Sequence, residues 1–153
     1  MNDAKKNKKL FEQTFISLLN KGCDIVLPVF GLSMFPFILP GDEVRVSPVN
    51  YDALQVGDVI VFENGGRLVA HRLLKIDVSK GWFISKGDGL MKVDGNNRLS
   101  DVYGLVVGQF RHQRAIKWSN TLFFKKSMAF LSPLVGYLNF YLGLVWHKYF
   151  RRS

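Results

Sequence analysis

The stretch Asp58-Val-Ile-Val-Phe-Glu-Asn-Gly-Gly-Arg-Leu-Val-Ala-His-Arg-Leu-Leu74 contains two apolar runs separated by Asn-Gly-Gly. Asn-Gly between two such runs is a strong signal for a β-hairpin. This stretch therefore predicts a pair of antiparallel strands.

Further strand patterns lie on both sides of this hairpin. Val44 and Val46 alternate with charged residues, and apolar runs occupy residues 82–85 and 102–107. Gly-Asp pairs separate these segments, as is typical of turns; they stand at 41–42, 57–58 and 87–88. Many short strands at close spacing predict a mainly β fold over residues 24–110, an antiparallel barrel or sandwich.

The segment before the β region has a different pattern. Residues 5–21 predict an amphipathic helix, because apolar side chains recur at three- and four-residue steps and Gly22 is a natural stop. The apolar positions are Leu10, Phe11, Phe15, Leu18 and Leu19. Polar residues interrupt any long apolar run, which excludes a secretory signal peptide. We divide the chain into a helix at 1–22, a β domain at 23–118 and an apolar, basic-flanked tail at 119–153.

The tail contains 20 uncharged residues, 127–146, which is enough to cross a bilayer as a helix. Pro133 and two glycines lower its helical and apolar character. Three arrangements stay open: a marginal spanning helix, a helical hairpin in one leaflet, or a helix that covers the β domain.

Charge favours an anionic surface as a partner. The net charge is +9, and lysines and arginines cluster at both ends of the chain beside apolar segments. That distribution suits a membrane surface better than a nucleic-acid groove, so we expect membrane association and no nucleic acid. A single cysteine allows no disulfide within the chain, and neither metal-ligand spacing nor a nucleotide-binding motif is present. We therefore expect no cofactor and no metal.

Two residues carry the candidate chemistry. Ser33 lies in Gly31-Leu-Ser-Met-Phe-Pro36, between a glycine and a proline, and His71 lies in the second run of the hairpin. A serine hydroxyl needs a base to take its proton before it can attack a carbonyl. His71 could supply that base or be a hydrogen-bonded core histidine. The pair suggests acyl transfer, most simply proteolysis.

Residues 28–110 resemble the signal-peptidase-type serine endopeptidases, a superfamily that includes the self-cleaving repressors. The resemblance rests on five short motifs in order: Gly31–Pro36, Gly41–Val46, Gly57–Phe62, His71-Arg72, and Lys86-Gly87-Asp88 with the strand from Tyr103. Most bacterial members have lysine where this chain has His71. The chain is thus similar to the histidine-type branch of the endoplasmic reticulum, the archaea and some spore formers.

The resemblance implies Ser33 as nucleophile and His71 as general base. A Ser–His pair usually needs an acid that orients the imidazole. Counting along the family's acidic motif gives Asp94, while Asp88 and then Asp101 are the alternatives. Many family members carry a serine where this chain has Gly31, so the oxyanion would depend on the Ser33 backbone N–H. Gly31 itself is also explained as a tight-turn glycine.

Together these features predict a serine endopeptidase that cleaves a leader or precursor peptide bound in extended form. The family's usual anchor precedes the serine motif, and residues 5–21 are too polar to provide one. With 127–146 as a tail anchor, the catalytic domain would stay on the cytoplasmic side. The competing prediction is a non-catalytic basic β-barrel that binds nucleic acid or a protein partner.

Overall fold

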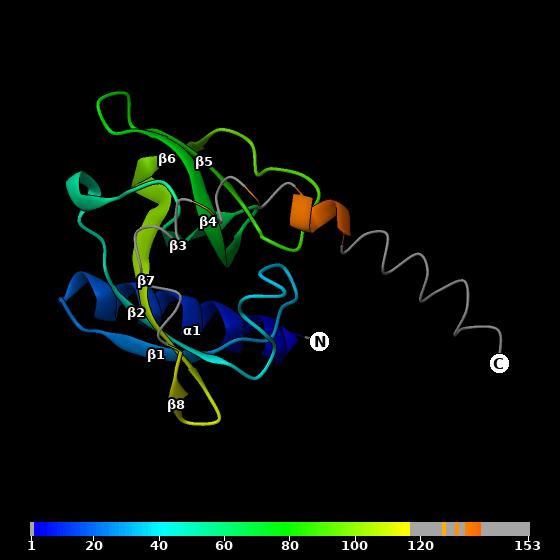
Figure 1. The fold of residues 1–153 in the computed structure, drawn as a ribbon. Helices are drawn as coiled ribbons and strands as arrows, with labels where there is room; N and C mark the ends of the chain where they lie inside the picture. The colour runs from blue at the N-terminus through cyan, green and yellow to red at the C-terminus, as the bar shows by residue number, and fades with distance from the viewer. Residues whose placement is uncertain (1, 117–126, 128–130, 132–133, 139–153) are drawn as a thin grey trace, which may run out of the picture.

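The computed structural model describes residues 2–116, 127, 131 and 134–138 (Figure 1). The protein is mainly β, and its sheet curls into a half-barrel. Within the described residues, one long helix precedes eight strands that form one sheet in the order β1-β2-β7-β3-β4-β5-β6, with β8 beside β7. The elements are α1 (Asn2–Asn20), β1 (Ile25–Pro28), β2 (Glu43–Pro48), β3 (Val59–Asn64), β4 (Arg67–Asp77), β5 (Trp82–Lys86), β6 (Asn97–Arg98), β7 (Val102–Arg111) and β8 (Arg114–Ala115), with short 3-10 helices at Tyr51–Ala53 and Leu99–Asp101.

The hairpin expected from the sequence is β3–β4. Asn64 pairs with Arg67, so the two turn residues are Gly65 and Gly66 rather than the Asn-Gly dipeptide. Both glycines have positive φ angles, 58° and 75°. In a two-residue turn this conformation matches the twist of the flanking strands, and it would strain a residue that has a side chain. The resulting register sets His71 opposite Ile60.

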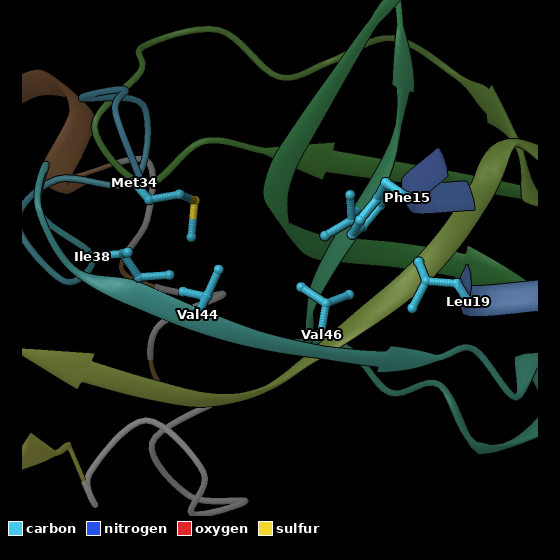
Figure 2. Close-up of a cluster of buried hydrophobic side chains, with 7 residues drawn as sticks. Phe15, Leu19, Met34, Ile38, Val44 and Val46 are labelled. Atoms are coloured by element: carbon cyan, nitrogen blue, oxygen red, sulfur yellow. The ribbon is translucent and has the colours of Figure 1, made fainter. Parts of the chain in front are cut away.

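The core is divided into two buried clusters, one on each side of the curled sheet. The first lies under α1 and contains Phe15, Leu19, Met34, Ile38, Val44, Val46 and Val61 (Figure 2). The second lies among β3, β4, β5 and β7 and contains Leu54, Ile60, Phe62, Leu73, Phe83, Leu99 and Val102. The two faces of β4 therefore meet different surroundings.

Helix α1 packs across β1, β2 and β7 (Figure 1). Of its predicted apolar face, only Phe15 and Leu19 are buried. Gly104 of β7 permits this close packing, because a Cβ there would lie 2.5 Å from Val46 Cγ1 and 3.1 Å from Leu19 Cδ1. The other three apolar positions of the helix, Leu10, Phe11 and Leu18, are exposed.

Most of the predicted apolar segment 127–146 lies outside the described residues. Residues 134–138 are helical, and the backbone at Gly136 lies so close to the Leu90 carbonyl that a side chain would collide with it. No helix in the described part of the chain combines the length and apolarity that crossing a bilayer requires.

Candidate active site

His71 and Asp94 form the centre of the candidate site. The His71 Nδ1 atom, on β4, lies 2.6 Å from Asp94 Oδ2, in the loop after β5. The Asp94 backbone N–H donates to the Ser85 carbonyl at 2.8 Å, which holds this loop against β5. Both side chains are largely buried, with 5% and 10% of their surface exposed. A carboxylate only accepts, so Nδ1 carries the hydrogen and Nε2 is left as the basic nitrogen.

Two further side chains orient the Asp94 carboxylate. Ser85 Oγ donates to Oδ2 at 2.8 Å, and Asn64 Nδ2 donates to Oδ1 at 3.1 Å. Sequence reasoning did not identify either residue. Strand alternation could have suggested Ser85, because it pairs with Leu73 and so faces the same side of the sheet as His71. No comparable pattern pointed to Asn64, because its place before two glycines was already explained by the hairpin turn.

The turn that contains Ser33 is held against the loop after β5. The Gly89 N–H donates to the Ser33 carbonyl at 2.8 Å. A Cβ on Gly87 would lie only 2.6 Å from the same carbonyl oxygen, although Gly87 has no positive φ. Glycine is therefore required at 87 by contact rather than by backbone conformation. Met34, the residue after Ser33, is buried in the first core cluster and anchors the turn.

The Ser33 turn lies beside the end of β5. The β4–β5 ladder ends with the pair Arg72 and Lys86, and Gly87 follows directly in the chain. The Ser33 carbonyl occupies the space where a side chain at Gly87 would stand. No hydrogen bond joins the Ser33 hydroxyl to His71 in the described residues, and such bonds often tighten only when substrate binds.

The other two candidate acids lie elsewhere. Asp88 is completely buried and pairs with Arg72, whose Nη2 donates to it at 2.6 Å. Arg72 also donates to the Gly57 carbonyl at 2.8 Å. Asp101 lies in the 3-10 helix before β7 and accepts a bond from Ser100 Oγ at 3.3 Å. Of the three predicted alternatives, only Asp94 contacts the histidine.

Lys86 is a buried cation beside this network, with 1% of its surface exposed. Burial lowers the pKa of its ammonium group, and the charges of Asp88 and Asp94 oppose that shift. Its Nζ donates to the Gly87 carbonyl at 3.3 Å. The cation thus lies at the loop that holds the Ser33 turn.

The backbone at Gly31 does not have the conformation expected of a tight-turn glycine. Its φ lies outside the left-handed region, and an added Cβ would meet nothing closer than 4.0 Å, the distance to Ser33 N and Oγ. The backbone does not require glycine at this position. The tight-turn explanation of Gly31 therefore finds no support in its backbone, and a small side chain fits beside the serine.

A mainly apolar cavity of about 590 Å³ adjoins Ser33. Its floor belongs to the first core cluster, and its rims are residues 27–31 on one side and 67–70 on the other. In the described ladders, each rim has one edge without a paired strand. β1 pairs only with β2, and β5 pairs only with Arg72–Asp77 of β4, which leaves residues 67–70 unpaired on that side. The cavity is thus the gap between two open edges of the half-barrel.

In the part of the chain that the structure describes, no group of His, Cys, Asp and Glu side chains is large enough to hold a metal ion. No protein-family model matches the chain, and no curated protein matches its sequence.

Proposed function

We propose that this protein is a serine endopeptidase of the signal-peptidase type that cleaves a leader or precursor peptide. The observation that carries the proposal is the 2.6 Å contact between His71 Nδ1 and Asp94 Oδ2, with Asp94 in the same loop whose Gly89 N–H binds the Ser33 carbonyl. A buried carboxylate on one imidazole nitrogen leaves the other nitrogen to act as a base, which is the logic of a catalytic triad.

In this mechanism the His71 Nε2 atom takes the proton of Ser33 Oγ while Oγ attacks the scissile carbonyl carbon. The tetrahedral intermediate collapses, the C–N bond breaks, and the imidazolium returns the proton to the leaving amine. Water then attacks the acyl-enzyme with His71 again as base, which releases the new carboxylate and the free serine. The Ser33 backbone N–H is the proposed oxyanion donor.

The cavity supports an extended polypeptide as substrate. Residues 27–31 and 67–70 present two uncovered strand edges to the same gap, so a peptide strand there can hydrogen-bond on either side. The apolar floor favours small or apolar side chains at alternate substrate positions. Main-chain pairing would supply affinity, and the floor would supply selectivity.

A serine-reactive fluorophosphonate tests the catalytic proposal. We expect the wild-type protein to be labelled, Ser33→Ala to lose labelling completely, and His71→Ala to lose at least about 100-fold in labelling rate. Ser100→Ala is the matched control, because Ser100 is exposed and does not line the cavity. Undiminished labelling of a folded Ser33→Ala protein would contradict the proposal and favour a non-catalytic binding domain.

We also propose that the protein works at a membrane surface, with the cytoplasmic side as one of two alternatives. Phe30, Leu32 and Phe35 are exposed around the Ser33 turn, and the chain is strongly basic. Exposed apolar side chains combined with positive charge favour anionic lipid.

Flotation with vesicles of phosphatidylglycerol, against phosphatidylcholine as control, tests this membrane proposal. Phe30→Ser with Leu32→Ser should reduce flotation, and equal flotation of wild type and variant would contradict it. Protease protection of the domain in intact cells tests the side.

A further inference from the structure

We propose that α1 forms the outer wall of the substrate groove and that Phe11 determines specificity for one substrate side chain. The side chain is that of the third residue before the cleaved bond (P3), where P1 is the residue whose carbonyl Ser33 attacks. This inference rests on the proposed endopeptidase function. It concerns a segment that precedes all the motifs from which that function was predicted.

Phe11 and Phe15 both line the cavity that contains Ser33. They are four residues apart, so they lie on the same face of α1 about 6 Å apart along its axis. Phe15 is 2% exposed and belongs to the core, whereas Phe11 is 54% exposed even though it borders the cavity. The Phe11 ring therefore has surface available to whatever occupies the groove. Leu10 is equally exposed but does not border it.

The floor of the groove has the spacing of an extended peptide. In Figure 2, Met34 lies with Val44 at one end of the cluster, and Phe15 lies by Val46 at the other. Val44 and Val46 are two residues apart on β2, which is about 6.8 Å along a strand. Alternate side chains of an extended substrate have the same separation. A P1 side chain at Met34, next to Ser33, therefore brings the P3 side chain to Val46 and the α1 wall.

The apolar character of this wall determines which P3 side chains it can bind. The floor residues and both phenylalanines at the P3 position are apolar, and among the described residues that line the cavity only Arg67, on β4, is charged. A branched or aromatic P3 side chain would bury apolar surface against Phe11. An Asp at P3 would lose its hydration without gaining a partner at the floor. We therefore expect Leu or Phe at P3 to be preferred over Ala, and Asp to be rejected.

The experiment begins with a random decapeptide library, whose cleavage products, identified by mass spectrometry, define the P1 preference. Peptides that differ only in Leu, Ala or Asp at P3 are then compared in kcat/KM. We expect Leu to exceed Ala by about 10-fold in the wild type and by less than about 2-fold in Phe11→Ala. Leu10→Ala is the matched control and should keep the full ratio. An unchanged ratio in Phe11→Ala, or an equal loss in Leu10→Ala, overturns the inference.

Binding separates this inference from the catalytic proposal. The same fluorescent peptides, and the undigested library peptides if none is cleaved, are titrated by anisotropy into Ser33→Ala and Ser33→Ala/Phe11→Ala proteins. A preference in binding for Leu over Ala at one peptide position that disappears with Phe11 supports the groove even if the wild type cleaves nothing, which would refute the catalytic proposal alone. Cleavage with no effect of Phe11 refutes the inference alone, and the absence of any binding refutes it as well.

Discussion

His71 and Arg72 are neighbours on β4, and each holds an aspartate from the segment after β5, yet the two pairs differ in their surroundings. Arg72 and Asp88 are closed off from solvent, with two guanidinium nitrogens on the carboxylate. Asp94 is slightly exposed, and its two carboxylate oxygens contact the side chains of His71, Ser85 and Asn64. Consecutive strand residues face opposite sides, so the two pairs lie on opposite faces of the sheet.

The comparison separates a pair that stabilises the fold from a pair suited to chemistry. A guanidinium keeps its proton at every physiological pH, so the Arg72 pair can hold β4 to the loop but cannot transfer a proton. An imidazole exchanges its proton near neutral pH, and a carboxylate on one nitrogen orients it for that exchange. The following variants test this distinction by their effect on the free energy of unfolding, from the largest to the smallest.

Arg72→Met should be the most destabilising change. It leaves the buried Asp88 carboxylate without its hydrogen-bonded cation, with only the charge of Lys86 nearby, and we expect a loss of about 3–5 kcal/mol in urea unfolding. The double variant Arg72→Met/Asp88→Leu removes both charges and should recover most of that loss, because an apolar pair needs no desolvated charge. If the double variant is as unstable as the single one, the charge pair is not the source of the effect.

Asp42 tests a third carboxylate, one whose cation is partly exposed. Hydrogen bonds from Arg111 lower the pKa of Asp42 to about 2, against burial, which raises it. Because the folded pKa is below the unfolded value of 3.8, ionised Asp42 stabilises the fold above pH 4, and this contribution is lost as the pH falls toward 2. The shift corresponds to roughly 2 kcal/mol. The stability difference between wild type and Asp42→Asn should therefore be largest at pH 6 and shrink by roughly two-thirds of that amount at pH 2.5. A pH-independent difference would exclude this linkage.

Asp94→Asn should affect chemistry much more than stability. The amide keeps the size of the carboxylate and can still accept from Ser85, so we expect a loss of only about 1 kcal/mol in unfolding. The fluorophosphonate labelling rate should fall by about 10²-fold or more, because the amide no longer selects the tautomer with a basic Nε2. Asp101→Asn is the matched control, and an equal effect on labelling in that variant would remove the special role of Asp94.

Gly31→Ser should leave stability unchanged within about 0.5 kcal/mol, since the position is exposed and has room for a Cβ. A hydroxyl there lies beside Ser33 and can donate to the developing oxyanion. We expect the labelling rate to rise by about 10-fold, at the low end of the effect of one oxyanion donor. Gly31→Ala provides the control, because it adds the Cβ without the donor. A similar rise in both variants would point to backbone rigidity.

The sequence predicted the β character of the domain well, because strand alternation and hairpin turns are local features. It was a poorer guide to side-chain contacts between residues that are far apart in the chain. The three Gly-Asp pairs look alike, and each was interpreted as a turn. Asp42 and Asp58 each accept a bond from an N–H three residues earlier, those of Leu39 and Gln55, but Asp42 also pairs with Arg111, and Asp88 pairs with Arg72. Local pattern could not distinguish them, since the cations are 69 and 16 residues away.

The amino-acid sequence by itself determined the candidate serine and histidine, because their residue types and order are visible in the chain. Only the tertiary structure decided which aspartate meets His71, since Asp94 is brought there by the pairing of β4 with β5 and by the bond from its own N–H to Ser85. It also decided that α1 borders the groove, because Phe15 is buried against strands far along the chain and Phe11 is carried with it. Helix periodicity shows which side chains share a face, but only packing determines which part of that face stays open.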